Sequence, residues 1–327
     1  MIKTIGGITK TNSMKLQQLR YIIAVDRHKQ FSKAAEELDL SQATLSSMIG
    51  KLEKELGVMI FDRKTQPLVT TDCGKELIMA ARRILSETDN FYDLARNVKQ
   101  KVAGQLRLGI IPTISSSLLP IFLRPFLLKY PEVELEIIEA PTASLTEALK
   151  RGELDLAILS TPLKDSSIED WVLYYELLLV YGSAEEQIKR YTTPDILLER
   201  PLWLLEEGNC LREQMLDLCQ LRQKASPWPN LKLGANSFDC LLPLVDQMGG
   251  LTLVPELYLQ QLSEERQQRL AYFERPVPVR EISLAFYRPY AKLRLMEVLH
   301  KEIKELVKPL LKSQQYKNNE MRITMPE

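Results

Sequence analysis

The sequence predicts an α/β protein with a winged helix-turn-helix at residues 14–72, a linker helix at 73–102 and a two-lobed α/β domain. Three observations support this: clustered apolar-periodic helices, a heptad pattern directly after them, and alternating apolar runs and helical stretches beyond Gly104. The 327 residues are 45% hydrophobic and 26% charged, as in a globular protein. Residues 1–13 lack a secretion signal's apolar core and no apolar run reaches roughly eighteen residues, so we expect a flexible extension, no membrane partner and a cytoplasmic protein.

Three short helices are expected in the N-terminal domain, where apolar residues recur at helical spacing over 16–25, 31–38 and 45–56. Leu40 and Ser41 form the expected turn, with Ser41 capping the third helix. The small pair Ala34 and Ala35 allows two helices to cross closely, as a helix-turn-helix requires. Gly57 is expected to end the third helix.

The other face of the third helix carries groups suited to base edges and phosphates, since they are short hydrogen-bonding side chains and one cation: Gln42, Thr44, Ser46, Ser47 and Lys51. VMIFDRKTQPLVTTDCG is expected to form two strands around a polar tip, which places Arg63 and Lys64 near phosphates. Each residue alone also fits a solvated surface. The 43 basic and 43 acidic residues give no net charge, so the prediction of DNA binding rests on the combined motif.

The stretch FSKAAEELDLSQATLSSMIGKLEKELGVMIFDR resembles, position for position, the DNA-binding domain of LysR-type bacterial transcriptional regulators over residues 14–75. One departure is Ala43, where the family very often has proline; that position opens the helix, so the fold is unaffected. The resemblance implies an effector domain of the periplasmic-binding-protein type. It also implies a double-stranded DNA operator, bent DNA, contact with RNA polymerase and a homotetramer arranged as a dimer of dimers.

The linker helix is expected to start at about Thr71 and to dimerise, because apolar residues step alternately by four and three, as in a coiled coil: Leu77, Ala81, Ile84, Thr88, Phe91, Ala95, Val98 and Val102. Thr88 is the weak position. A helix buried against its own domain would give similar spacing. Cys73, just before the seam, is expected to be a small packed residue.

Beyond Gly104, short apolar runs and helical stretches predict mostly parallel sheets covered by helices. The expected strands are QLRLGII, VELEIIE, DLAIL, PLWLLEE, KLGA, LTLVP and ISLAFY. We expect lobe I at 103–176 and 281–312, lobe II at 177–280, and crossings near Tyr174–Ala184 and Val277–Ile282. The polar segment 313–327 is expected to be a flexible tail.

A ligand pocket is expected between the lobes, because ligands in such folds bind beyond the carboxyl ends of strands. IPTI follows the first strand, APTAS the second and YRP the last. These segments predict that Thr113, Thr142 and Arg288 line one pocket.

The segment GNCLREQMLDLCQ predicts a helix capped by Asn209, with Leu211, Met215 and Leu218 on its buried face. Nine helical steps separate Cys210 from Cys219, which leaves their α-carbons roughly 13 Å apart on opposite sides. A disulfide needs α-carbons within about 7 Å. The two cysteines are therefore either unrelated, or the helix unwinds when they join.

Cys210 is expected to be the more reactive thiol, because it lies at the positive end of the helix dipole with Arg212 and Arg288 near. Cys219 lacks such help, which predicts an attacking and a resolving cysteine. The alternative is two small buried hydrophobic residues. Cys240 is expected in the core.

GNCLREQMLDLC, together with GIIPT, EAPT and FYRP, resembles the peroxide-sensing activators of the LysR-type family over Met14 to about Leu311. The resemblance implies that Cys210 is the peroxidatic thiol and Cys219 its resolving partner. It implies that Thr113, Thr142 and Arg288 hold peroxide or tune the thiolate. Hydrogen peroxide would be the signal, oxidative-stress genes the target and a cellular thiol the reductant. The family usually has histidine where this chain has Asn209, which cannot carry a proton but can still cap and hydrogen-bond.

Two other functions remain open from sequence. A regulator of the same family that binds a metabolite in the cleft would leave the cysteines inert. A thiol enzyme is disfavoured, because there is no C-x-x-C and the two histidines, His28 and His300, lie outside the cleft motifs. The same shortage disfavours a zinc site or a Ser-His-Asp hydrolase, so we expect no enzyme activity, no metal and no cofactor.

Overall fold

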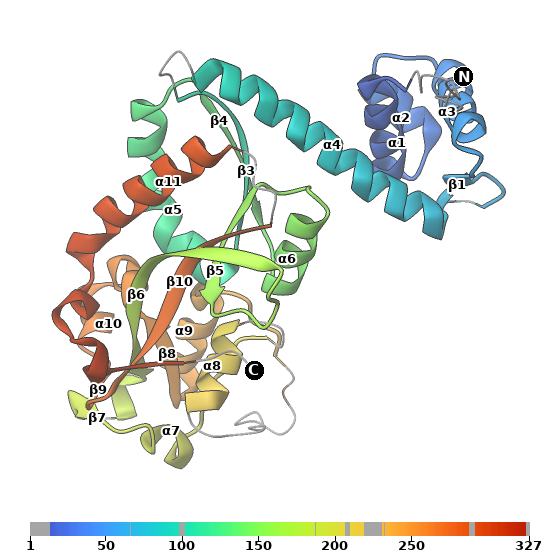
Figure 1. Cartoon of the computed structure of the whole chain (residues 1–327). Helices are drawn as coiled ribbons and strands as arrows, with labels where there is room; N and C mark the ends of the chain where they lie inside the picture. Colours follow the sequence, from blue (N-terminus) through green and yellow to red (C-terminus); the bar gives the residue numbers. More distant parts are fainter. Residues whose placement is uncertain are drawn as a thin grey trace, which may run out of the picture. The chain divides into compact units, whose positions relative to one another are not determined.

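The computed structural model describes residues 14–65, 67–97, 102–186, 188–206, 210–218, 231, 233–287 and 292–324. The chain forms two compact units, Met1–Tyr92 and Asp93–Glu327. Figure 1 shows the elements of both units, coloured along the sequence. Within the described ranges, no helix combines the length and apolar character needed to span a membrane.

The first unit is the expected winged helix-turn-helix. Helices α1 (Leu16–His28), α2 (Phe31–Glu37) and α3 (Gln42–Leu56) surround one apolar core. Ser41 caps α3, since its side chain accepts a hydrogen bond from the Thr44 backbone N–H at 3.1 Å. Gly57, at φ 73°, ends α3 in the left-handed conformation that glycine adopts without strain. Strands β1 (Phe61–Asp62) and β2 (Val69–Thr70) pair antiparallel and form the wing.

Helix α4 (Asp72–Asn97) follows the wing and divides the predicted seam between two environments. Ala81 is buried in the core of the first unit, so this part of the pattern reflects packing within the domain. Ile84 and Phe91 are exposed, at 41% and 71%. Val98 lies outside the described residues. Val102 was predicted to be helical, but it lies in irregular chain just before β3, where it packs on the lobe I core.

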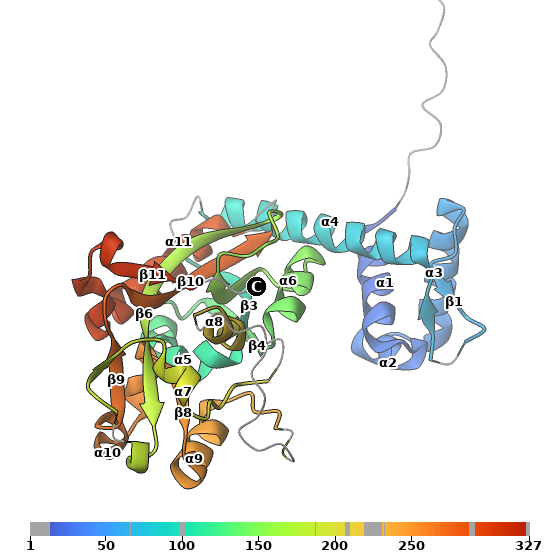
Figure 2. The same ribbon diagram turned by 90° about the horizontal axis from the view of Figure 1, so that it is seen from below.

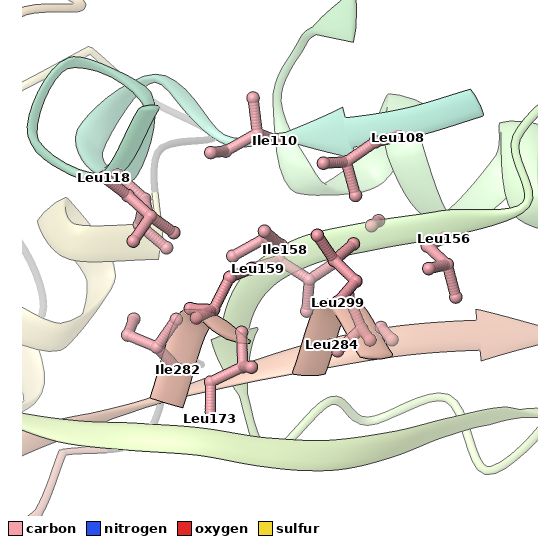
Figure 3. Close-up of a cluster of buried hydrophobic side chains, with 14 of the residues drawn as sticks. Leu108, Ile110, Leu118, Leu156, Ile158, Leu159, Leu173, Ile282, Leu284 and Leu299 are labelled. Carbon is pink, nitrogen blue, oxygen red and sulfur yellow. The ribbon is translucent and has the colours of Figure 1, made fainter. Parts of the chain in front are cut away.

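Lobe I is a sheet covered by helices. Strand β3 (Gly104–Ile110) pairs parallel with β4 (Val133–Glu139) and β5 (Leu156–Thr161). Helices α5 (Pro112–Lys129), α6 (Thr142–Lys150) and α11 (Leu293–Val307) complete the lobe. Figure 3 shows part of the lobe I core, in which Leu108 and Ile158 from the sheet and Leu299 from α11 are buried.

Two long antiparallel strands, β6 (Ile168–Gly182) and β10 (Val277–Tyr287), run from lobe I into lobe II. Strand β6 contributes Leu173 to the lobe I core and Leu178 to the lobe II core. The prediction of mostly parallel pairing is therefore wrong for the middle of the sheet, which has the order β4-β3-β5-β10-β6-β9-β7. The reason is topological, because a chain that crosses out and returns brings its two crossing strands together in opposite directions.

Lobe II contains β7 (Tyr191–Thr192), β8 (Leu251–Pro255), β9 (Leu270–Phe273), α7 (Ile196–Glu199), α8 (Cys210–Leu218), α9 (Phe238–Met248), η1 (Ala184–Glu186), η2 (Glu256–Gln261) and α10 (Glu264–Gln267). Two predicted strands are wrong in their described residues. PLWLLEE makes only an isolated bridge from Leu202 to Leu251, and residues 233–235 of KLGA are irregular. In PLWLLEE, Leu202, Trp203 and Leu205 are buried in the lobe II core without a strand ladder, so hydrophobic burial alone produced the apolar pattern.

Two cysteines lie at the surface, contrary to the sequence prediction. Cys73 lies in the first turn of α4 and Cys240 lies on α9, and both are exposed. On α9 the buried positions are Phe238, Leu241, Leu242 and Val245, so Cys240 falls between them in sequence but on another side of the helix.

Residues 313–324 form defined elements, where the sequence predicted a flexible tail, and 325–327 lie outside the described residues. After η3 (Lys308–Leu310) it forms η4 (Lys312–Gln315), η5 (Asn318–Glu320) and β11 (Met321–Ile323). Strand β11 pairs parallel with residues 277–279 of β10, beside it in Figure 2. Strand β5 pairs with β10 only over 281–285, so the earlier part of β10 accepts another neighbour. Main-chain hydrogen bonds thus order a segment without an apolar period.

Candidate functional site

Cys210 is the first residue of α8, and the helix joins the two lobes. Leu211, Met215 and Leu218 lie in the lobe II core, which confirms the predicted buried face. Cys210 itself is 7% exposed and packs with the lobe I core. The thiol is therefore held against one lobe by a helix that is anchored in the other.

Thr142 is the residue that contacts the thiol directly. It is the first residue of α6, and its hydroxyl and the Cys210 Sγ form a hydrogen bond. Helices α6 and α8 lie close together in Figure 2, as this bond requires. When the thiol is ionised, only the hydroxyl has a proton to give, so Thr142 then donates to the thiolate.

Burial raises the pKa of the Cys210 thiol above its ordinary value. The Thr142 hydrogen bond and the charge of Arg280 act in the opposite direction, but burial is the largest influence. Burial therefore outweighs the influences expected from sequence to depress this pKa, and Arg288, one of these, lies outside the described residues. The guanidinium of Arg212 donates to the Leu205 carbonyl at 2.9 Å. The reduced protein consequently holds Cys210 mainly as a neutral thiol at pH 7.

Arg280 is a site residue that sequence reasoning missed. It is 0% exposed on β10, and its Nε donates to Glu176 Oε1 at 2.6 Å. Its other nitrogens donate to the Thr113 hydroxyl at 3.2 Å and the Thr113 carbonyl at 3.1 Å. The structure thus brings Thr113 to Arg280, and Thr142 to Cys210. The available signal was one cation inside the apolar stretch PVPVREISLAFY, since arginine is almost never fully buried unless paired.

A second buried carboxylate completes a network at the crossing strands. Glu256 is 3% exposed and accepts the backbone N–H groups of Leu177 at 3.2 Å and Lys312 at 2.5 Å. Glu176 in turn accepts the Leu257 N–H at 3.1 Å. Burial is the main cause that raises the pKa of Glu256, and the neighbouring charge of Glu176 adds to it. The place where β6 and β10 pass between the lobes therefore contains one buried cation and two buried carboxyl groups.

Three predicted site residues, Asn209, Cys219 and Arg288, lie outside the described residues. Their assignments stay predictions. Of the predicted cysteine pair, Cys210 is described, and it is a free cysteine.

The predicted DNA-contacting residues lie on α3 and the wing. Gln42, Thr44, Ser47 and Lys51 are exposed and Ser46 is half-buried, whereas Leu45, Ile49 and Leu52 form the buried stripe of α3. Thr44, Ser47 and Lys51 lie on the side opposite that stripe, and Gln42 and Ser46 lie along its edge. Arg63 donates to Ser46 at 3.0 Å and pairs with Glu53 at 2.8 Å. Lys64 is exposed beside it on the wing. A surface hollow of about 640 Å³ is lined by Gln42, Ser46 and Arg63 together with residues of the α1–α2 turn.

Comparison with known proteins agrees with this architecture. The LysR substrate binding domain profile matches residues 99–308, and that of the bacterial regulatory helix-turn-helix protein, lysR family, matches residues 16–75. The hydrogen peroxide-inducible genes activator of Haemophilus influenzae is 33% identical over 285 residues, which cover 86% of this chain and 93% of the relative. The DNA-binding transcriptional dual regulator OxyR of Escherichia coli is 31% identical, with coverage of 86% and 92%.

Solved structures show the same relationship. A full-length OxyR variant from Pseudomonas aeruginosa has a TM-score of 0.74 and 28% identity, covering 89% of this chain and 98% of that one. A Corynebacterium glutamicum OxyR cysteine mutant with bound H₂O₂ has a TM-score of 0.60 and 26% identity, with coverage of 92% and 95%. The chain therefore belongs to the LysR family of bacterial regulatory helix-turn-helix proteins, in the group of the hydrogen peroxide-inducible genes activators.

Proposed function

We propose that this protein is a DNA-binding transcriptional activator that senses hydrogen peroxide through a reversible disulfide between Cys210 and Cys219. The observation that carries the proposal is the position of Cys210. It opens a helix at the junction of the two lobes, its sulfur contacts the Thr142 hydroxyl, and the buried charge of Arg280 favours its ionised form. The named relatives, which are peroxide-inducible activators, support the same reading.

The chemistry needs one peroxide and two thiols. The Cys210 thiolate attacks one peroxide oxygen, the O–O bond breaks, and the departing hydroxide takes up a proton to become water. The resulting sulfenic acid is attacked by the Cys219 thiolate, which forms the S–S bond and releases the second oxygen as water. Two electrons pass from the thiols to the peroxide. A cellular dithiol returns them and resets the switch.

The proposed shape change follows from the helix. Cys210 is the first residue of α8, and Leu218, eight residues later, is still helical. A continuing helix would keep the α-carbons of Cys210 and Cys219 roughly 13 Å apart, but a disulfide requires about 7 Å or less. The disulfide therefore forms only when α8 unwinds, and unwinding removes Leu211, Met215 and Leu218 from the lobe II core.

The DNA-binding proposal assigns α3 to the major groove. Gln42, Thr44, Ser46, Ser47 and Lys51 would contact bases and phosphates, with Arg63 and Lys64 on the flanking backbone. Ile84 and Phe91 on α4 support pairing with a second copy of the chain, since both are exposed apolar residues at heptad spacing. A dimer of dimers and contact with RNA polymerase complete the proposed assembly.

Peptide mapping by mass spectrometry tests the proposed chemistry. Reduced protein is treated briefly with one equivalent of hydrogen peroxide, and thiols are then blocked before digestion. The proposal predicts a Cys210–Cys219 disulfide that is absent from Cys210→Ser. If Cys210 and Cys219 stay reduced while the exposed Cys73 and Cys240 react no faster than a free thiol, the peroxide-sensing proposal fails, and a metabolite bound between the lobes becomes the signal to seek.

A further inference from the structure

We propose that the C-terminal segment from Lys312 to Thr324, here called the C-terminal clasp, holds α8 in its helical form. It thereby sets the rate at which the Cys210–Cys219 disulfide forms. The redox part of this inference rests on the function proposed above. The clasp lies beyond residue 308, where the match to the LysR substrate binding domain ends. Its effect on α8 follows from hydrogen bonds made in the reduced protein.

The clasp is fixed to the crossing strands at its start. The backbone N–H of Lys312 donates to Glu256, and the Ser313 hydroxyl donates to the Tyr175 carbonyl at 2.6 Å. Tyr316 then packs on the small core formed by β6 and β10, with the Arg275 guanidinium 5.6 Å from its ring centroid. Ser313 thus joins the clasp to β6, and Lys312 joins it to Glu256 of η2.

The end of the clasp is fixed to β10. Met321, Arg322 and Ile323 pair with residues 277–279, and Arg275 pairs with Glu320 at 2.5 Å. The Thr324 backbone N–H donates to the Val279 carbonyl at 2.9 Å, and its hydroxyl contacts the same oxygen at 3.2 Å. Thr324 is 0% exposed. Its carbonyl is therefore held in a defined position inside the protein.

Gln214 of α8 donates a hydrogen bond to that carbonyl. Its side-chain Nε2 donates to the Thr324 carbonyl at 3.0 Å and to the Ser160 hydroxyl of β5 at 3.0 Å. Gln214 is 0% exposed, so water does not compete for these hydrogen bonds. One amide group thus ties the middle of α8 to a lobe I strand and to the C-terminal clasp.

The position of Gln214 makes this tie relevant to the switch. It lies four residues after Cys210, so the two side chains share one face of α8 and both point to partners outside lobe II. Gln214 also lies inside the segment that must unwind before Cys219 can reach Cys210. Unwinding therefore breaks the bond to Thr324 and leaves buried polar groups unpaired, which is unfavourable. Gln214 is a positioning residue, and Thr324 is its anchor.

The first experiment measures the helix itself, by hydrogen–deuterium exchange of the peptide covering 210–218 in reduced full-length protein. Deletion of Met321–Glu327 removes β11 and Thr324, whereas deletion of Pro326–Glu327 leaves both and is the matched control. We expect the longer deletion to speed exchange in α8 about fivefold, the factor for one net hydrogen bond, and the control to leave exchange unchanged. Gln214→Leu, which removes the bonds to both Thr324 and Ser160, should speed exchange in α8 at least as much with the clasp intact.

Combining the two changes tests whether they act through one contact. Gln214→Leu together with the longer deletion should speed exchange in α8 no more than Gln214→Leu alone, because both remove the same bond. Fully additive effects, or a deletion that leaves exchange in 210–218 unchanged, would overturn the clasp. If the deleted protein fails to fold, Gln214→Leu still tests the proposal. Exchange in 210–218 of that variant as slow as in the wild-type protein would also overturn the clasp.

The second experiment separates the clasp from the peroxide chemistry. Disulfide formation after peroxide addition should be about fivefold faster in the longer deletion than in its control. In a Cys219→Ser background, where only the sulfenic acid can form, the two deletions should react at equal rates. An equally accelerated sulfenic step would overturn the clasp, because it would show that the tail limits peroxide access. Wild-type protein that forms no disulfide would refute the proposed function, while exchange in α8 would still decide the clasp.

Discussion

At the scale of single residues, the site depends on the balance of influences on one sulfur. Burial favours the neutral thiol of Cys210, and the Thr142 hydroxyl and Arg280 charge favour the thiolate. The thiol is thus kept largely protonated, and the Thr142 hydroxyl is in place to donate to the thiolate when it forms. A thiolate with a higher pKa is also the stronger nucleophile once formed.

Removing the donor should slow the peroxide reaction. Thr142→Val keeps the shape of the side chain but loses the hydroxyl that contacts Cys210. Because hydrogen bonds to charged groups contribute about 1.5–3 kcal/mol, we expect the rate of sulfenic acid formation to fall at least about tenfold. The rate is measured by trapping the sulfenic acid in a Cys219→Ser background. Thr146→Val, which removes an exposed hydroxyl of α6 bonded to the Ala143 carbonyl, is the control. A Thr142→Val rate equal to that of the control would contradict the assignment.

The pH dependence of the same reaction follows from the direction of the pKa shift. A cysteine ordinarily titrates near 8.5, and burial raises the pKa of Cys210. Below its pKa the thiolate fraction increases tenfold per pH unit, so the sulfenic rate should rise about tenfold per unit from pH 6 to 8. Stopped-flow rates in the Cys219→Ser background measure this. A plateau of the rate at or below pH 7 would instead indicate a depressed pKa, and would contradict a neutral Cys210 thiol in the reduced protein.

At the scale of elements, the crossing strands β6 and β10 are held by a buried ion pair. Arg280 and Glu176 are both fully buried and their side chains contact at 2.6 Å. Such a pair is strongly destabilising to break from one side, because the remaining charge has no partner. The pair also fixes Thr113, whose hydroxyl and carbonyl both accept from Arg280.

Breaking this pair should reduce stability strongly. Arg280→Met leaves Glu176 buried without its cation, and we expect a loss of about 3–5 kcal/mol in the free energy of unfolding. Denaturant unfolding of the effector domain measures it. The double variant with Glu176→Gln should recover part of the loss, since no unpaired charge then remains. Losses that simply add would show that the two residues act independently.

Local periodicity predicted some elements well. The face of α8 that contains Leu211, Met215 and Leu218 is confirmed, because burial of one side of a helix leaves a direct pattern in sequence. The buried role of Arg280 was not predictable in this way, since its partner Glu176 is 104 residues away. The clasp was missed for a related reason, because main-chain pairing with β10 orders it without an apolar period.

At the scale of the whole molecule, the proposed redox event lies in the effector domain and DNA binding in the N-terminal unit. The family membership covers both parts of the chain. The sequence predicted the order of the parts correctly, because the helix-turn-helix pattern and the strand–helix alternation are both local. The pairing directions of β6 and β10 were not predictable in this way, since they depend on contacts between segments about 100 residues apart.

DNA binding should depend on Lys51. Because this exposed lysine of α3 is assigned to a phosphate, Lys51→Ala should weaken duplex DNA binding and reduce the slope of log K against log salt by about one per lost contact. Fluorescence anisotropy over a salt series measures both quantities. Lys301→Ala, on α11 of the effector domain, is the charge-matched control. An unchanged slope in Lys51→Ala would place the DNA on another surface.

We propose that disulfide formation converts α8 from a helix to an unwound segment. Hydrogen–deuterium exchange of residues 210–218, compared before and after one equivalent of peroxide, tests it most directly. We expect α8 to be protected in the reduced protein and to lose protection on oxidation, while Cys219→Ser, oxidised only to the sulfenic acid, keeps it. A protein that forms the Cys210–Cys219 disulfide while α8 stays protected would contradict the claim.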